Sequence, residues 1–283
     1  MDANDSIKFN QIRNYKRCFA DAAKMVVRLP SDLVRSLCLL WGISSIGLSG
    51  LLYITLFSES NWSILCGIVL VLFVLWLQSM ALSKLSFYIH DLRGTVNKKT
   101  ASCSLKGVVK HAINYFVLRI VQTLILGIVP LILTLLHVPN VYVLIVCVLA
   151  LFLITYMDLY FVSDTFLSTE KFLNSLSSSF RKCLKNISIS FIIYVSVAFF
   201  MGVSLMVLYT PTFVLSCGLG AQKFASQIGD SSNLIPFWVY IFHVFLMMCV
   251  FIVVNFILTF CRFAAVLFEN AIILRQEEKV KSM

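Results

Sequence analysis

The chain has 283 residues, of which 60% are hydrophobic and only 13% are charged, and its mean hydropathy is +0.93. A soluble domain cannot bury that much apolar surface, so the composition excludes a soluble globular protein and indicates a membrane protein. The formal net charge of +10 could suggest nucleic-acid binding. Anionic lipid headgroups next to the ends of membrane helices explain it better, so we expect lipid partners and no nucleic acid.

Six apolar blocks are long enough to cross a hydrocarbon core of about 30 Å, which takes roughly 20 helical residues. In chain order they are Leu37–Phe57, Trp62–Leu82, Phe116–Leu136, Val141–Met157, Ser188–Tyr209 and Pro236–Phe260. The short polar turn at 58–61 predicts one tight hairpin, and Pro139 predicts a second because proline cannot extend the preceding helix. The last two blocks form a third hairpin around a longer segment, 211–236, which we expect to lie outside the helices.

The distribution of Lys and Arg gives the orientation. If all six blocks cross the membrane, every one of the 23 basic residues except Lys223 falls on the same side. Cationic loops resist translocation, so this side is expected to be cytoplasmic. The sequence therefore predicts a multi-pass protein of the cytoplasmic (inner) membrane with both termini in the cytoplasm.

Three cytoplasmic segments, each preceding an odd-numbered membrane helix, have the apolar spacing of an amphipathic helix. The apolar faces comprise Phe19, Ala22, Ala23, Val26 and Val27; then Leu105, Val108, Val109, Ala112, Ile113 and Phe116; then Phe172, Leu173, Leu176, Phe180, Cys183, Leu184 and Ile187. The basic residues on the opposite faces are Lys24 and Arg28, Lys106 and Lys110, and Arg181, Lys182 and Lys185. Such cations can contact lipid headgroups or a membrane-protein partner, and both interpretations fit the pattern.

These patterns predict an all-α polytopic membrane protein with six transmembrane helices in three hairpins, each preceded by an amphipathic helix at the cytoplasmic interface. The whole chain, 1–283, forms one transmembrane domain, with repeat units at about 19–94, 104–170 and 172–275. When the even-numbered helices are aligned on their cytoplasmic ends, Lys84, Asp158 and Arg262 occupy equivalent places. They can form a structural ion cluster, because a carboxylate is costly at this depth without a cation, or reach water separately.

Few polar residues lie at membrane depth. Gln78 and Gln122 suggest interhelical hydrogen bonds, and His243 and Asn255 are twelve positions apart, too far for one metal or one proton. His90 beside Asp91 suggests a solvated pair at a helix end. The sequence contains no HExxH, GxSxG or phosphate-loop motif and no CxxC or Cys/His spacing for a metal, so we expect no enzyme activity and no cofactor.

The plan of short amphipathic helices alternating with hairpins resembles a group of bacterial six-helix membrane proteins. The segment Phe172–Asn186 carries the likeness, with its Ser-rich run before Phe180, Arg181 and Lys182. The group includes the membrane domain attached to some glycerophosphodiester phosphodiesterases, and the resemblance implies the architecture without that activity. The leading interpretation is a non-enzymatic membrane protein that binds, scaffolds or helps to assemble membrane components. The alternative is a transporter or channel for a small solute or lipid.

Overall fold

The computed structural model describes residues 14–57, 62–92, 105–137, 139, 141–143, 145–147, 149–150, 187–227 and 235–281. All regular structure within these ranges is helical, which confirms the predicted all-α class. The helices with defined ends are α1 (Tyr15–Val27), α2 (Ser31–Phe57), α3 (Trp62–Leu92), α4 (Leu105–Leu135), α7 (Ile187–Gln227) and α8 (Phe237–Lys281). Of these, α2, α3, α4, α7 and α8 contain stretches long and apolar enough to cross a membrane. Most of the predicted span Val141–Met157 lies outside the described residues.

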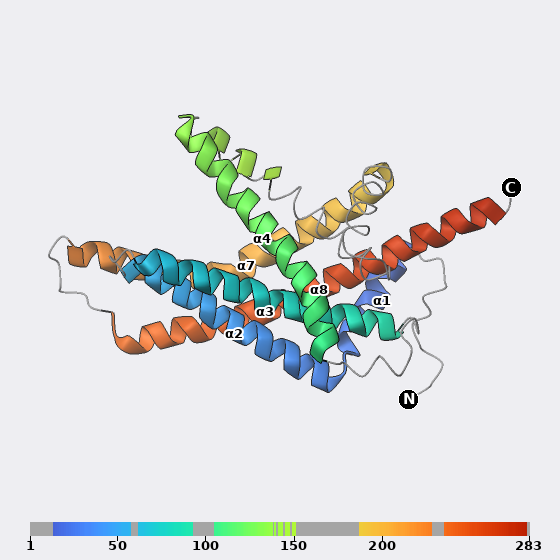
Figure 1. Cartoon of the computed structure of the whole chain (residues 1–283), viewed down its shortest axis with the longest axis horizontal. Helices are drawn as coiled ribbons and strands as arrows, with labels where there is room; N and C mark the ends of the chain where they lie inside the picture. The colour runs from blue at the N-terminus through green and yellow to red at the C-terminus, as the bar shows by residue number, and fades with distance from the viewer. Residues whose placement is uncertain are drawn as a thin grey trace.

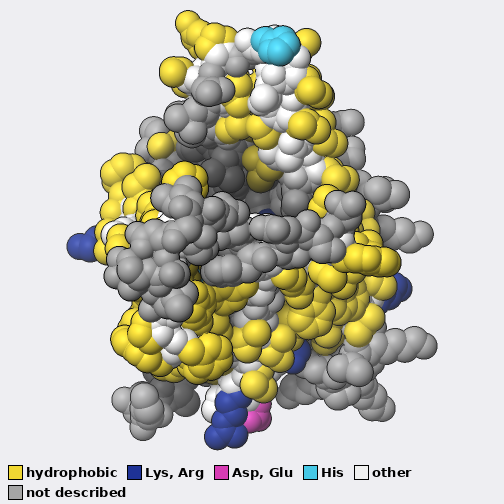
Figure 2. Space-filling view, turned by 90° about the vertical axis from the view of Figure 1, so that its left-hand side faces the viewer, with side chains coloured by type: hydrophobic (Ala, Val, Ile, Leu, Met, Phe, Trp, Pro, Cys, Tyr) yellow, Lys and Arg dark blue, Asp and Glu magenta, His cyan; other side chains and the backbone are white. Residues whose placement is uncertain are grey.

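The helices pack around α8 and around the pair formed by α2 and α3 (Figure 1). Helix α8 contacts α1, α2 and α7, whereas α4 contacts α3 and projects away from the bundle toward its own carboxyl end. Hydrophobic side chains cover much of the visible surface, and charged side chains are few (Figure 2). In water such a surface would aggregate, so this distribution is typical of a protein surrounded by lipid.

Small residues bring α2 close to its neighbours. A Cβ atom added to Gly47 would lie 2.8 Å from Cγ2 of Val74 on α3, so the backbone of α2 touches that side chain directly. Ser44, Ser45 and Ser49 are buried on the same helix, and each hydroxyl donates to a carbonyl oxygen three or four residues earlier. These bonds satisfy the hydroxyls without partners on another helix, which permits the close approach.

Helix α7 differs from the prediction. We expected the helix to end near Tyr209 and a segment to follow from Pro211, but the helix continues without a break to Gln227 and includes Pro211. Proline removes the backbone donor that would bond to the carbonyl oxygen of Val207, yet membrane helices tolerate proline where Ser or Thr side chains and local adjustments support the surrounding turn. The hydroxyls of Thr210 and Thr212, on either side of the proline, donate to the carbonyl oxygens of Met206 and Tyr209 at 2.6 and 2.8 Å. Helical continuity was therefore missed because proline was given too much weight.

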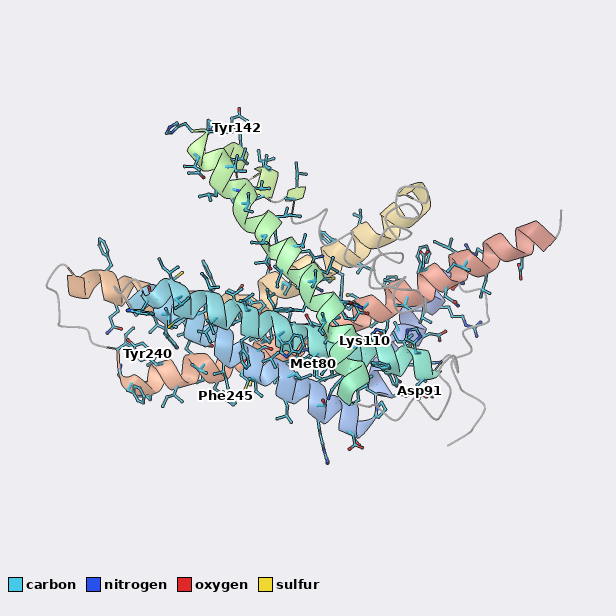
Figure 3. All side chains as sticks on the ribbon, in the orientation of Figure 1. Met80, Asp91, Lys110, Tyr142, Tyr240 and Phe245 are labelled. Carbon is cyan, nitrogen blue, oxygen red and sulfur yellow. The ribbon has the colours of Figure 1, made fainter. Side chains whose placement is uncertain are left out.

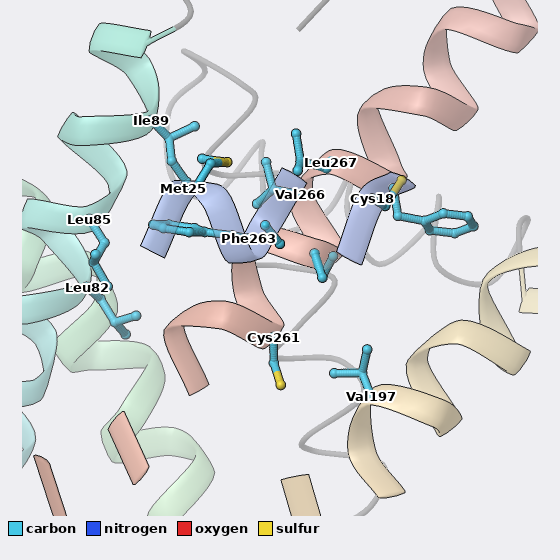
Figure 4. Close-up of a cluster of buried hydrophobic side chains, with 14 of the residues drawn as sticks. Cys18, Met25, Leu82, Leu85, Ile89, Val197, Cys261, Phe263, Val266 and Leu267 are labelled. Carbon is cyan, nitrogen blue, oxygen red and sulfur yellow. The ribbon is translucent and has the colours of Figure 1, made fainter. Parts of the chain in front are cut away.

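The main apolar core lies where the second half of α8 meets α1 and the ends of α2 and α3 (Figure 4). Almost every residue of α8 from 261 to 272 is buried, with Arg262 half-buried. A helix that is buried on all sides has to be covered by protein or by hydrocarbon around its circumference. Here Cys18 and Met25 of α1 and Leu85 and Ile89 of α3 supply part of that cover.

The first amphipathic segment is helical, but the prediction of its apolar face is wrong in part. The buried residues of α1 are Cys18, Ala22 and Met25, and they face α8, whereas Val27 is 85% exposed and Ala23 is exposed as well. The predicted face is thus rotated, because the buried thiol and thioether of Cys18 and Met25 were not counted among the apolar residues. The second segment is not a separate helix, since residues from Leu105 onward belong to the continuous helix α4. The third segment, 172–187, lies almost entirely outside the described residues.

Candidate functional site

A chain of hydrogen-bonding groups joins α2, α7 and α8 around His243, a side chain that is fully buried. Its Nδ1 atom lies 3.0 Å from the Tyr53 hydroxyl on α2, and its Nε2 atom lies 3.0 Å from the Ser216 hydroxyl on α7. Each end of the chain terminates on a main-chain carbonyl. The Tyr53 hydroxyl is 3.2 Å from the carbonyl oxygen of Tyr240, and the Ser216 hydroxyl is 2.8 Å from that of Thr212.

The network formed by Tyr53, His243 and Ser216 has more hydrogen-bonding contacts than polar hydrogens to fill them. Four contacts connect these groups, but a neutral imidazole brings one hydrogen, and the hydroxyls of Tyr53 and Ser216 bring one each. At any moment one of these four contacts therefore holds no hydrogen. A second hydrogen on the imidazole would fill the fourth contact, and an O–H group from outside would instead donate to a lone pair of Ser216.

The sequence brings these groups to one level of the bundle. His243 and Ser216 each lie six residues inside one end of an apolar span, at Phe237 and Gln222 respectively, which places them about 9 Å along the helix axis. Tyr53 lies two residues before the end of its own span. Tyr240, labelled in Figure 3, links α8 to α7 at this same end of the spans, because its hydroxyl donates to Gln222 Oε1 at 3.1 Å. These hydrogen-bonding groups therefore lie near one end of the three apolar spans rather than at their middle.

Two open cavities flank this chain of groups. One, of about 470 Å³, is lined by Tyr53, Phe237, Tyr240, Ile241 and Val244. The other, of about 420 Å³, is lined by Leu48, Leu51, Leu52, Thr55, Tyr209, Thr212, Phe213, Ser216 and Met247. A third cavity, of about 440 Å³, separates α3 from the outward-projecting part of α4, and Thr55 borders both this cavity and the second one. All three sizes fall within the range of ligand pockets, about 300–1,000 Å³.

The predicted ion cluster is only partly described. Lys84 on α3 donates to the hydroxyl of Ser36 on α2, and Arg262 lies half-buried on α8. Asp158 lies outside the described residues, so its pairing stays a prediction. Of the predicted headgroup contacts, Lys110 is exposed on α4 (Figure 3), whereas the side chains of Lys106, Arg181, Lys182 and Lys185 lie outside the described part.

Two of the other polar contacts lie within single helices. Arg119 donates to Gln122 at 2.9 Å, and Asn255 donates to the carbonyl oxygen of Phe251 at 2.8 Å. The side-chain nitrogen of Gln78 is buried and has no hydrogen-bond partner among the described residues, contrary to the expected interhelical bond. His90 is 8% exposed, so the expectation that it is solvated is wrong, whereas Asp91 is exposed as expected.

The sequence pattern compared His243 only with Asn255 on its own helix and so predicted no shared site for it. Its partners lie 190 and 27 positions away, in α2 and in the part of α7 that was assigned to a loop. The sequence did contain one indication of this contact. Tyr53 and His243 both lie near the predicted outer ends of their spans, so they are at a similar height in the bundle.

The described residues hold no group of three His, Cys, Asp or Glu side chains that could bind a metal ion. No protein-family model matches the chain, and neither a curated protein nor a solved structure shows significant similarity to it.

Proposed function

We propose that the chain is a non-enzymatic integral membrane protein that binds lipid between its helices. The observation that carries this proposal is the set of three apolar cavities of about 420–470 Å³ between helices that can cross a membrane. These cavities are open at the surface of the bundle, so in a bilayer the medium that meets them is hydrocarbon. An acyl chain is the ligand whose chemistry fits that lining, and it is present there at high concentration.

A binding role fits the polar chain better than acyl-transfer chemistry does. Ser216 beside His243 resembles a nucleophile with its base, but catalysis would also need donors for a developing oxyanion. Ser216 lies inside the continuous helix α7, where neighbouring backbone N–H groups bond to carbonyls of the preceding turn. The amides that usually form an oxyanion hole are therefore committed to the helix.

Lipid retention during purification tests the proposal. The protein is extracted in a mild detergent and examined by native mass spectrometry. Thr55→Trp with Ile241→Trp places bulky side chains in all three cavities, and Leu39→Trp with Ile43→Trp places them on exposed positions of α2 that line none of these three cavities. We expect lipid adducts on the wild type and on the control, and fewer on the cavity variant. Equal retention by both variants, or no lipid on the wild type, would overturn the proposal.

Transport of a small solute or lipid is the second candidate, and the burial of His243 within a span favours it. Ionisable side chains at membrane depth are expensive and often mark a pathway. Lipid binding and transport differ in whether a solute crosses the membrane. A dye or proton flux in reconstituted vesicles that His243→Phe abolishes would favour transport, whereas lipid binding predicts retained lipid with no such flux.

A further inference from the structure

The cavity between α2 and α7 has a defined polar edge as well as an apolar body. Leu48, Leu51, Leu52, Phe213 and Met247 form the apolar part. Ser216 and Thr212 face it from α7, and Thr55 faces it from α2. The volume of about 420 Å³ has a mostly apolar lining with a few hydroxyls at its edge. A ligand that matches this lining has one apolar chain and a small polar end.

Among these polar groups, Ser216 differs from the threonines in its hydrogen bonds. The hydroxyls of Thr55 and Thr212 each donate to one carbonyl oxygen of their own helix, at 2.8 Å in both cases. The Ser216 hydroxyl contacts both a carbonyl oxygen and His243 Nε2. When the hydrogen of the imidazole is on Nδ1, toward Tyr53, the Ser216 oxygen accepts nothing from the groups of this chain, and its lone pairs are available to the cavity.

We propose that this cavity binds a single-chain amphiphile whose neutral O–H group donates a hydrogen bond to Ser216. The inference rests on the proposed lipid binding and names its ligand class: a fatty alcohol, a protonated fatty acid or a monoacylglycerol. The O–H group donates to a lone pair of the Ser216 oxygen that no group of the Tyr53–His243–Ser216 network uses when the imidazole hydrogen is on Nδ1. A neutral end group also matches the depth of Ser216, about 9 Å inside the end of its span, where a charged group would be costly.

Photolabelling with matched probes tests this assignment. The full-length protein in lipid nanodiscs is irradiated with a long-chain fatty alcohol that carries a diazirine in its chain, and separately with the methyl ether of the same compound. We expect the alcohol to label peptides of α2 and α7 that line the cavity, and to do so about fivefold more than the ether, the difference that one hydrogen bond makes.

Two variants separate the hydrogen bond from the cavity. Ser216→Ala should remove the preference for the alcohol over the ether, whereas Thr210→Val, an exposed hydroxyl on α7 outside the cavity, should keep it. A melting temperature within a few degrees of wild type, followed by tryptophan fluorescence, shows that each variant is folded. Unchanged alcohol preference in Ser216→Ala, or equal labelling of the wild type by both probes, overturns the inference.

Native mass spectrometry on the same samples keeps the two proposals apart. Lipid adducts that persist while the alcohol shows no preference would leave lipid binding in place and reject the O–H ligand at Ser216. Loss of all adducts from the wild type would reject both.

Discussion

At the scale of single residues, the contacts of His243 make a prediction about stability. Tyr53→Phe and Ser216→Ala each remove one contact to the imidazole, and each should lower the free energy of unfolding by about 0.5–1.5 kcal/mol, the usual range for such bonds between membrane helices. The double variant should lose less than the sum, because both changes act on one histidine. Thermal unfolding in detergent measures all three.

Thr210→Val is the matched control, since its hydroxyl bonds only to its own helix in the described structure. Its free energy of unfolding should stay within about 0.5 kcal/mol of the wild type. Strict additivity of Tyr53→Phe and Ser216→Ala would show that the two contacts are independent and that the groups do not act as a chain.

The sequence predicted where His243 lies but not which residues contact it. Hydropathy marked His243 as a rare polar residue within an apolar block, and in the structure it is buried within the apolar span of α8. Its partners could not be predicted, because Tyr53 and Ser216 meet it only through packing of helices far apart in the chain. The pattern of one helix carries no information about which face of another helix it meets.

At the scale of elements, the contact of α2 with α3 depends on Gly47. Gly47→Ala would place a Cβ atom 2.8 Å from Cγ2 of Val74, a short branched side chain with little freedom to move. We expect a loss of about 1–3 kcal/mol in the free energy of unfolding, as for other overpacked sites. Thermal denaturation in detergent provides the measurement.

Val74→Ala, combined with Gly47→Ala, should restore part of that loss because it removes the obstructing methyl group. Gly202→Ala on α7 is the control, since nothing lies within 4 Å of the added atom. If Gly47→Ala is as stable as Gly202→Ala, then α2 and α3 do not approach as closely as described here.

The position of α1 gives a second prediction for an element. Met25 is 1% exposed against α8, whereas Val27 on the same helix is 85% exposed. Met25→Lys should therefore sharply reduce the yield of folded protein, because it buries a charge without a partner, and Val27→Lys should have little effect. Size-exclusion chromatography of a fluorescent fusion compares the two yields.

The opposite pattern would favour the sequence-based interpretation, in which Val27 belongs to a face that lies in the lipid headgroups. The difference between the two interpretations shows what amphipathic patterns can and cannot predict. Spacing predicted a helix at α1, which the structure confirms. It did not predict that protein, rather than lipid, covers the apolar side, because either environment selects the same residue types.

At the scale of the whole molecule, the positions of the helices were predicted better than the positions of their ends. Apolar blocks correctly indicated α2, α3, α4 and the first part of α8. Helix α8 nevertheless continues past Phe260 to Lys281, and its 45 residues span about 68 Å, more than twice the hydrocarbon core. A prediction from hydropathy ends the helix where charged residues begin. The backbone hydrogen bonds of a helix do not depend on hydropathy, so the helix can continue past that point.

Orientation in the membrane is a further prediction at this scale. Because every basic residue except Lys223 falls on one predicted side, a reporter fused after Met283 should be cytoplasmic, and a tag inserted near Gly229 should be external. Paired reporters that are active only inside or only outside the cell measure both positions. The reversed result would invert the topology and would place the Ser216 level at the cytoplasmic face.

The central claim, that lipid occupies the spaces between these helices, is tested most directly by cryo-electron microscopy of the protein in lipid nanodiscs. We predict tubular density for an acyl chain between α2 and α7, running along Leu48 and Leu52 and ending beside Ser216. A map in which α7 closes onto α2 and protein side chains fill all three cavities would contradict the claim.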